Sequence, residues 1–588
     1  MRFFLMCFNT FTLPEINATL IKTNTFMTAI TCSVSGENFL IYPLEEELLD
    51  KISPTIKGQN FPLPPATISP VERLRQRMAF RNDRTLYQRK CSLTGKDILA
   101  VYHPETKFPV YSMSAWWSDA WDPLTYGRDF DFNRSFFEQF AELQSAVPRL
   151  AMINKNPINS DYVAIGSDNK NCYLCSPSTA NEDCLYGGVN YHSKNVVDGY
   201  LSLRDEVAYD IIHCEDCYST FFSKDCSHCS EIYFSENCSS CQNCFGCFGL
   251  KNKQFCWFNE QLSEAEFRKQ EAEFLAQLSR EKIEGMKRKF TEFAQRQPHR
   301  PLYLRNTENC LGDYLSNCKN CINCFDLDDA QDCVHVTRLA KGIVDSVDSC
   351  EGADGVVLCY NVMSAGLNLY HAICATFAWG CRDVMYCDHC FNVEDCFGCI
   401  GLRNHAKYCI FNKQYTKEEY EVLVPKIIAH MQKTGEWGKF FPASLAPFGY
   451  NETIANVHYP LTKEEAKQRG YNWNDYQSPQ VPVPALTASD LPQTIAEVSD
   501  QILNQAIVCE SSGKRFRVVK QELEFYRAHN LPLPTKHPDI RHLNRVHARN
   551  PRVFAKRVCP QCTKEFETTF SPNNKVLVYC EECYVKQS

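Results

Sequence analysis

Cysteines recur at a constant spacing of twelve residues in the middle of this chain. Two series follow that spacing: Cys214, Cys226 and Cys238, and Cys217, Cys229 and Cys241. Small apolar residues at one phase of a constant period indicate a structural repeat in which each unit covers the next. Twelve residues suit two short strands and two turns, so the spacing predicts a β-solenoid. Residues three apart on a strand point to opposite faces. Both cysteines of a C-x-x-C pair therefore face inward only if a corner lies between them.

The Cys-rich region occurs twice, first over residues 169–306 and again over residues 307–477. Each copy contains a C-F-G-C-x-G-L-K/R-N segment, beginning at Cys244 and at Cys396, and each continues into a helix with an S/T-x-x-E capping signal. The twelve-residue spacing is weaker in the middle of the second copy. The expected fold is mostly β with added helices: duplicated Cys-rich β-solenoid-like repeats flanked by treble-clef and zinc-ribbon modules.

Three interpretations of these cysteines are open. Burial is the usual state of free cysteine, which then acts as a small apolar residue, and we favour this interpretation. The second is metal binding at a few C-x-x-C corners, for which the best candidates are Cys244 with Cys247 and Cys396 with Cys399. The third is disulfide bonding, which requires an oxidising compartment.

Thirty-four cysteines in 588 residues would be usual for a secreted chain. The N-terminal residues, however, lack the length and cleavage site of a signal peptide. No stretch has the ~20 apolar residues of a membrane helix. We therefore expect a cytoplasmic protein with reduced or metal-bound thiols and no membrane contact. Residues 1–26 carry no pattern and are expected to form a disordered extension.

Two closely spaced cysteine pairs near the C-terminus form the strongest chemical motif. Cys559 and Cys562 are separated from Cys580 and Cys583 by seventeen residues. Each C-x-x-C turn directs two thiolates to one point, and two such turns make the tetrahedral S4 site that Zn²⁺ prefers. Four protein ligands leave no position for a reactive water, so the motif predicts a structural zinc ion.

The two ends of the chain, residues 27–125 and residues 494–588, follow the same plan. Each has an early cysteine turn, a Pro-rich segment, an Arg-rich helix and a second cysteine turn. The first end has lost its zinc ligands, because Thr94, Ser112 and Ala115 stand where the second has Cys562, Cys580 and Cys583. We expect a degenerate tandem zinc-knuckle module at 27–125, and zinc-free turns at Cys32, Cys91 and Cys509 that are held by apolar packing.

The module at Cys509 resembles the "probable zinc-ribbon" treble-clef family. That family's pattern is C-x-x-C-G-K-x-F, then E-x-x-F-Y, then P-x-x-C-x-x-C-R. The corresponding residues here are Cys509, Ser512, Gly513, Lys514, Phe516, Glu522, Phe525, Tyr526, Pro534, His537, Ile540 and Arg541. The resemblance covers about thirty residues and implies a treble clef at 505–547 that retains one of the four zinc ligands. Residues 126–168 are expected to form a helical bridge, and residues 478–493 a Pro-rich linker.

The Arg-rich helices concentrate positive charge in a chain whose net charge is −8. Residues 69–96 hold eight Lys/Arg and two Asp/Glu, a net of +6, and residues 536–564 hold eight and one, a net of +7. Arginines in such helices can position a protein on RNA or DNA phosphates. They can equally pair with the acidic Cys-rich copies of the same molecule. The candidates are Arg73, Arg77, Arg81, Arg84, Arg541, Arg545, Arg549 and Arg552.

In overall pattern, from Thr28 onward, the chain resembles a family of uncharacterised Cys-rich bacterial proteins with terminal zinc ribbons and C-F-G-C segments ending in F-N-x-Q. That resemblance implies no activity, and the sequence contains no recognisable catalytic motif. We therefore predict a non-enzymatic, zinc-binding scaffold that docks on RNA, DNA or a ribonucleoprotein through its basic ends. A thiol-rich metal-handling or redox protein and a structural envelope solenoid are the alternatives. A protein partner is also compatible with the sequence, which does not specify an oligomeric state.

Overall fold

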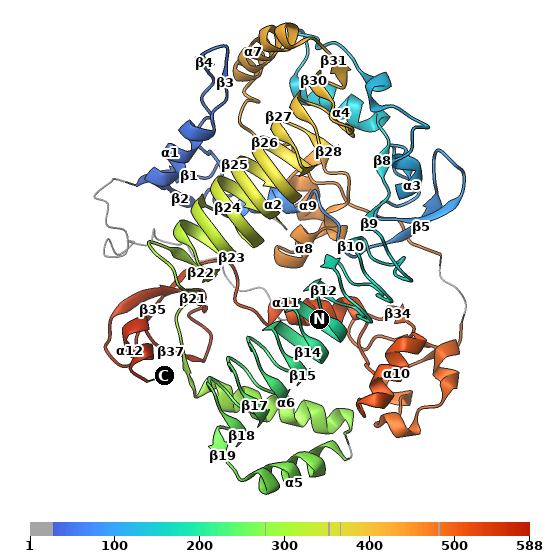
Figure 1. The fold of residues 1–588 in the computed structure, drawn as a ribbon, viewed down its shortest axis with the longest axis vertical. Helices are drawn as coiled ribbons and strands as arrows, with labels where there is room; N and C mark the ends of the chain where they lie inside the picture. The colour runs from blue at the N-terminus through green and yellow to red at the C-terminus, as the bar shows by residue number, and fades with distance from the viewer. Residues whose placement is uncertain (1–26, 277, 351–352, 365, 480–482, 588) are drawn as a thin grey trace.

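The computed structural model describes residues 27–587 apart from 277, 351–352, 365 and 480–482. The predicted N-terminal extension, 1–26, lies outside the described residues. The fold is mixed α/β, with two large and mostly parallel sheets of eleven strands each (Figure 1). Helices lie in both terminal modules and after both large sheets.

Each large sheet contains strands in nearly unbroken chain order. The first sheet consists of β9 (Ile153–Lys155), β10 (Ile165–Ser167), β11 (Ser178–Thr179), β12 (Gly188–Tyr191), β13 (Lys194–Leu203), β14 (Glu206–Glu215), β15 (Tyr218–Phe221), β16 (Ser230–Tyr233), β17 (Gln242–Phe245), β18 (Gln254–Trp257) and β19 (Glu260–Gln261). The second consists of β21 (Leu304–Arg305), β22 (Leu311–Ser316), β23 (Lys319–Val334), β24 (Thr337–Cys350), β25 (Ala353–Met363), β26 (Gly366–Trp379), β27 (Arg382–Met385), β28 (Asp388–Phe391), β29 (Glu394–Phe397), β30 (Lys407–Ile410) and β31 (Lys413–Gln414).

In the first sheet the chain returns to the same position every twelve residues. Tyr218 lies beside Ser230, and Ser230 beside Gln242, in parallel register. Every third residue has a left-handed backbone, for example Asp216 with φ of 53° and Ser219 with φ of 51°. These residues are corners, and one lies between the two cysteines of each C-x-x-C pair. The corner that the cysteine spacing required is confirmed.

The residue after each corner points into the space that the chain encloses. In one twelve-residue turn the inward side chains are Cys226, Cys229, Ile232 and Ser235, none more than 2% exposed. Because every third residue is a corner, the enclosed space is narrow and holds aliphatic side chains and cysteine but no aromatic ring among its buried residues. Cysteine fills this space as a compact apolar group. Each sheet thus encloses its own cysteine-rich core, and the predicted burial of the cysteines is confirmed.

The second sheet departs from the twelve-residue spacing in its middle. Ala340 lies beside Ala353, and Ala353 beside Gly366, so these turns contain thirteen residues. Twelve-residue spacing returns where Tyr370 lies beside Arg382. One added residue per turn explains why the cysteine spacing fades there in the sequence.

Both large sheets end in a short antiparallel strand. β19 pairs with β18, and β31 pairs with β30. An asparagine with a left-handed backbone precedes each final strand, Asn259 with φ of 66° and Asn412 with φ of 62°. The Asn412 amide accepts from the N–H of Ile400 (2.8 Å) and donates to its carbonyl (2.7 Å), and Asn259 bonds Phe248 in the same way. Each asparagine side chain therefore makes backbone hydrogen bonds of the kind that a further strand would make.

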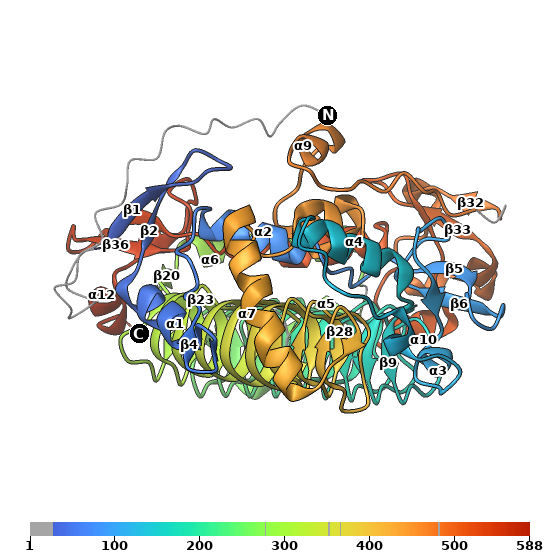
Figure 2. The ribbon, with the colours of Figure 1, turned by 90° about the horizontal axis from the view of Figure 1, so that it is seen from above.

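Helices cover the layer formed by the large sheets (Figure 2). They are α1 (Pro43–Ile52), α2 (Pro70–Met78), α3 (Met113–Trp116), α4 (Phe136–Ala146), α5 (Glu264–Leu275), α6 (Arg280–Gln295), α7 (Lys417–Thr434), α8 (Ile454–His458), α9 (Lys463–Gln468), α10 (Lys520–Ala528), α11 (Pro538–His547) and α12 (Glu581–Val585). The two expected capping boxes, at Ser263 before α5 and Thr416 before α7, are confirmed. Two helices, α5 and α6, follow the first sheet, where the sequence suggested one.

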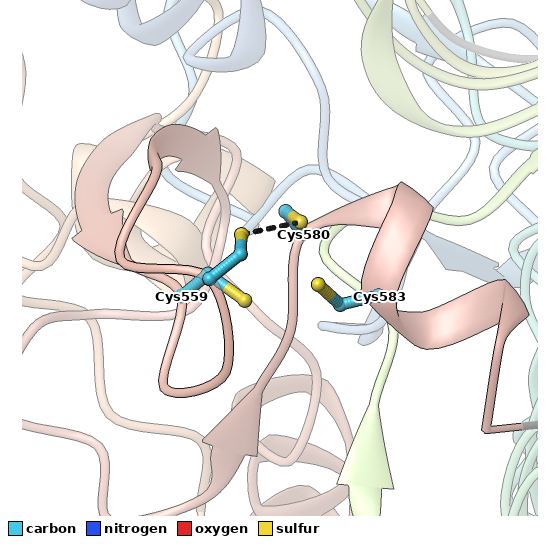
Figure 3. A group of neighbouring side chains, drawn as sticks. Cys559, Cys580 and Cys583 are labelled. Atoms are coloured by element: carbon cyan, nitrogen blue, oxygen red, sulfur yellow. Dashed lines mark hydrogen bonds between the residues drawn. The ribbon is translucent and has the colours of Figure 1, made fainter.

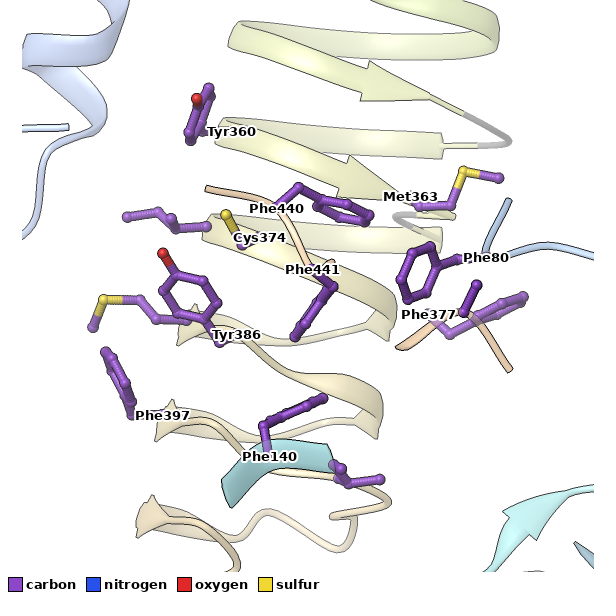
Figure 4. Packing of buried hydrophobic residues seen from close by; sticks show 14 of the residues in the cluster. Phe80, Phe140, Tyr360, Met363, Cys374, Phe377, Tyr386, Phe397, Phe440 and Phe441 are labelled. Carbon is purple, nitrogen blue, oxygen red and sulfur yellow. The ribbon is translucent and has the colours of Figure 1, made fainter. Parts of the chain in front are cut away.

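A large apolar cluster joins the N-terminal half of the chain to the second sheet. Phe441, from the segment after α7, packs against Phe140 of α4 (ring centroids 4.9 Å apart), Phe80 after α2 (6.0 Å) and Tyr386 after β27 (6.1 Å) (Figure 4). Aromatic rings supply a large buried area per residue. This cluster fixes the N-terminal module on the second sheet.

Short strands complete the terminal modules. Five two-stranded pairs are β1 (Thr28–Thr31) with β2 (Asn38–Ile41), β3 (Thr55–Ile56) with β4 (Gln59–Asn60), β5 (Tyr87–Lys90) with β6 (Asp97–Ala100), β7 (Val110–Tyr111) with β8 (Arg149–Leu150), and β35 (Ala555–Val558) with β36 (Glu565–Thr568). A separate three-stranded sheet consists of β32 (Ala485–Leu486), β33 (Ala506–Val508) and β34 (Arg515–Phe516). A further pair, β20 (Pro298–His299) with β37 (Leu577–Val578), joins the C-terminal module to the connection between the large sheets.

Two predicted segments contain more structure than expected. The helical bridge, 126–168, includes α4 but also β8 to β10, so the first large sheet begins before residue 169. The Pro-rich linker, 478–493, contributes β32, which pairs with β33 of the C-terminal module. Both segments are therefore built into neighbouring sheets along part of their length.

Candidate metal centre

Cys559 opens a tight turn between β35 and β36. Its N–H donates to the carbonyl of Lys564 (2.9 Å), and the N–H of Thr563 donates to the Cys559 carbonyl (3.0 Å). Thr563 takes the left-handed backbone, with φ of 63°, that such a turn needs. Antiparallel pairing of β35 with β36 holds the turn, so the thiols of Cys559 and Cys562 lie on the same side of it.

The second cysteine pair lies at the start of α12. Cys580 is the residue that caps this helix, and the N–H of Cys583 donates to its carbonyl (3.1 Å). The sulfur atoms of Cys562 and Cys580 are 3.5 Å apart, and all four sulfurs lie within 4.8 Å of one another (Figure 3). The structure therefore brings together all four residues that the sequence assigned to a metal.

Backbone donors favour the ionised form of Cys559. Burial opposes ionisation of this thiol, but N–H groups of Cys580, Cys562 and Gln561 outweigh it and lower its pKa to about 6. A thiolate is the form of cysteine that binds metals. Four converging sulfurs with no further ligand can hold a metal ion such as Zn²⁺ in a closed tetrahedral site. Among the described residues no other group of three or more Cys, His, Asp or Glu converges in this way.

The other three cysteine turns keep the same backbone with a single thiol. In each turn the backbone N–H of the cysteine donates to the carbonyl five residues later. These bonds join Cys32 to Glu37 (2.7 Å), Cys91 to Lys96 (2.8 Å) and Cys509 to Lys514 (2.9 Å). Ser112 is the residue before α3, as Cys580 is the residue before α12, and its N–H donates to the Cys91 sulfur (3.3 Å). Each of the three thiols is buried in an apolar cluster. The three turns therefore share the backbone hydrogen bond of the Cys559 turn, and their thiols pack in apolar surroundings.

The four remaining candidate ligands lie inside the large sheets. Cys244 and Cys247 donate to the carbonyls of Gln242 (3.3 Å) and Phe245 (3.5 Å). The thiols of Cys396 and Cys399 donate to the backbone carbonyls of Glu394 and Phe397, each at 3.4 Å. All four are buried in the cysteine-rich cores. Their thiols are parts of a packed column.

On the N-terminal module, two arginines of α2 share one carboxylate of the second sheet. Arg77 donates to Asp348 (3.0 Å), and Arg73 donates to the same carboxylate and to Glu45 (3.0 Å). The Arg73 and Arg77 side chains are 4% and 1% exposed. Burial raises the pKa of Glu45, but Arg73 outweighs it, and the pKa falls to about 2. Farther along the chain, Arg81 pairs with Asp83 (2.6 Å), and Arg84 lies 3.8 Å from Asp539.

On the C-terminal module, the corresponding arginines of α11 bind the first sheet. Arg541 and Arg545 share Asp198, and Arg545 lies 2.8 Å from it. Arg549 and Arg552, which follow α11, share Asp326 of the second sheet at distances of 2.5 and 2.8 Å. All eight candidate arginines thus bind carboxylates of their own molecule, which is the internal pairing that the sequence left as an alternative. Because these guanidinium groups are mostly buried, they do not form an exposed surface for nucleic-acid phosphates.

The carboxylates that hold these arginines carry only a weak signal in the sequence. Asp198 and Asp348 are corner residues with φ of 61° and 56°. Aspartate tolerates a left-handed backbone better than most residues. An aspartate two residues after an inward-facing residue therefore indicates a corner position. Its place in the sequence does not show which helix will bring arginines to it.

No helix in the described part of the chain is long and apolar enough to cross a membrane. Comparison with known proteins adds no functional assignment. No protein-family model matches this chain. No curated protein matches it either.

Proposed function

We propose that this protein is a non-enzymatic scaffold in which two β-solenoid segments are held together by a zinc-binding C-terminal module. The parallel strands support the solenoid architecture, because the chain returns every twelve residues in the first sheet and mostly every twelve or thirteen in the second. The four-cysteine cluster supports zinc as the bound metal, because an all-sulfur tetrahedral donor set is one that Zn²⁺ prefers.

One observation carries the proposal: the four-cysteine module is attached at the connection between the two large sheets. β37 pairs with β20, and the Tyr579 N–H donates to the His299 carbonyl (3.0 Å). The Thr568 hydroxyl donates to the Pro301 carbonyl (2.6 Å). A metal that orders Cys580 and α12 also orders the strand that binds this connection. Zinc would therefore stabilise the relative arrangement of the sheets.

Metal analysis and hydrogen exchange test this role together. We expect about one zinc ion per chain, lost in Cys580→Ser and kept in the matched control Cys509→Ser, whose turn has a single thiol. Removing zinc from the wild type should speed amide exchange at residues 298–305 more than within β13 or β26. Several zinc ions per chain would favour the metal-handling alternative. No zinc, or unchanged exchange at 298–305, would refute the proposal.

Nucleic-acid docking is not part of this proposal. The arginines that suggested it are engaged with Asp198, Asp326 and Asp348, and separating them would leave buried charges without partners. A purified protein that carries tightly bound RNA or DNA would reopen that hypothesis.

A further inference from the structure

Within the metal centre, Cys562 differs from the other three cysteines in its exposure to solvent. Cys559, Cys580 and Cys583 are buried, whereas Cys562 is exposed. Its sulfur lies 3.5 Å from that of Cys580, which comes from the second cysteine pair (Figure 3). An oxidant that arrives from solvent therefore meets Cys562 first and finds a second sulfur beside it.

The apolar packing around the metal centre is slight. Its buried members are three of the four cysteines themselves, and Phe566 and Tyr579 pack against them. The related turns at Cys91 and Cys509, each with a single thiol, belong to clusters that also contain residues of the large sheets. Because binding of a metal contributes directly to folding, the C-terminal module depends on its metal more than those turns do.

The residues beside Cys580 also hold the connection between the large sheets. β37, which precedes Cys580, pairs with β20, and the Tyr579 N–H donates to the His299 carbonyl (3.0 Å). On the other side of Cys580, Glu581 lies 3.1 Å from Arg300. A displacement of Cys580 therefore displaces groups that bind this connection.

We propose that the metal centre is a redox switch, in which a peroxide oxidises Cys562 and Cys580 to a disulfide and the module loses its zinc ion. This inference rests on the zinc-binding role proposed above and adds a means of regulating it. The disulfide leaves Cys559 and Cys583 as ligands, and two thiolates do not complete the four-coordinate site of a structural zinc ion. The pairing of β37 with β20 should then weaken.

The oxidation takes place in two steps. First, the Cys562 sulfur attacks one oxygen of hydrogen peroxide, so that an S–O bond forms, the O–O bond breaks and the departing hydroxide takes up a proton. The Cys580 sulfur then attacks the Cys562 sulfur, so that an S–S bond forms, the S–O bond breaks and a second hydroxide takes up a proton. Together the two sulfurs lose two electrons, and one peroxide becomes two water molecules. The two protons come from the thiols or from solvent.

Peroxide treatment of the zinc-loaded, full-length protein tests the switch. A small excess of hydrogen peroxide should release about one zinc ion per chain to a chelating dye. Peptide mapping should find the Cys562–Cys580 disulfide, with the interior thiol of Cys226 still reduced. Amide exchange at residues 298–305 should become faster. A thiol reductant with added zinc should reverse all of these changes, because a disulfide is reducible whereas a sulfinic acid is not.

Cys562→His separates zinc binding from disulfide formation. Histidine can replace cysteine as a zinc ligand but forms no disulfide, so this variant should bind zinc and keep it under the same treatment. The matched control is Cys310→Ser, which removes the half-buried thiol outside the metal centre and should release zinc as the wild type does. If Cys562→His binds no zinc, the disulfide mapped in the wild type decides.

Three results would overturn the switch: a disulfide between other cysteines, equal zinc release from Cys562→His and the wild type, or oxidation that a thiol reductant does not reverse. A wild-type protein that binds zinc but keeps it under peroxide would overturn the switch alone. A protein that binds no zinc would overturn both the switch and the scaffold role.

Discussion

At the scale of single residues, aspartates at left-handed corners determine how the terminal modules attach. Asp198 and Asp348 occupy such corners in different sheets, and each is shared by two arginines that are four positions apart on a helix. Residues four apart lie on one helix face, so a single carboxylate reaches both guanidinium groups. Because these groups are buried, loss of the carboxylate would leave cations without compensation.

Asp198→Asn should destabilise the protein strongly. Asparagine also tolerates the left-handed backbone, so the change removes mainly the charge that Arg541 and Arg545 require. We expect a loss of about 3–5 kcal/mol, as for other broken buried pairs. The control is Asp216→Asn at another left-handed corner, where the Arg204 partner is 45% exposed and a loss of ~1 kcal/mol or less is expected. Urea midpoints measure both, and similar midpoints would show that buried pairing with Asp198 is unimportant.

At the scale of elements, the sequence predicted the turns of the first sheet better than those of the second. Cys217, Cys229 and Cys241 recur on a spacing that the register of the strands repeats. In the second sheet, Ala340 and Ala353 lie thirteen residues apart on neighbouring strands, and a fixed period cannot detect one added residue per turn. The four-cysteine cluster was predictable in full because its ligands are adjacent in sequence and define their own geometry. The arginine partners were not predictable, since ion pairs between distant segments depend on the packing of whole elements.

The corner between β13 and β14 should make stability depend on pH. Asp205 is buried there, and burial raises its pKa to about 7 although its carboxylate accepts from Ser202 and from the N–H of Cys217. Between pH ~4 and ~7 the folded state therefore keeps a proton that the unfolded state has lost. Stability from this group is present at low pH and is lost as the pH rises toward 7.

Asp205→Asn should remove that dependence, since the amide oxygen can accept from the Cys217 N–H and the amide nitrogen can donate to the Ser202 hydroxyl, and neither ionises. We expect the variant to match the wild type near pH 4 and to exceed its stability at pH 8, by on the order of 4 kcal/mol from the linkage relation. Thermal unfolding at several pH values measures the difference. A difference that is constant with pH would contradict the assignment.

At the scale of the whole molecule, the Arg-rich helices of the two terminal modules attach to opposite sheets. The N-terminal helix α2 contacts β24 and β25 of the second sheet, whereas α11 contacts β13 and β14 of the first. The sequence predicts that the two ends follow the same plan, but on that plan either helix could cover either sheet. The choice of sheet is set by the ion pairs: Asp348 of the second sheet binds the arginines of α2, and Asp198 of the first sheet binds those of α11.

This arrangement leaves few cysteines accessible in the folded molecule. Among the described cysteines, Cys562 is exposed, Cys310 is half-buried, and the rest are buried. Burial also raises the pKa of interior thiols such as Cys226 and Cys390 well above its ordinary value, so we expect slow alkylation. Peptide-resolved mass spectrometry after brief alkylation should find Cys562 labelled once zinc is removed, and the interior thiols labelled only after denaturation. Equal labelling of Cys226 and Cys562 in the folded protein would contradict the buried cores.

Asn259 and Asn412 have a consequence for self-association. A parallel sheet in which each strand is a template for the next has no intrinsic length limit, and its last strand would offer unpaired N–H and carbonyl groups to another molecule. The two asparagine amides bond to Phe248 and Ile400, and the final strands then reverse direction. Each stack is therefore terminated within the chain, and this end is closed to growth into a fibre.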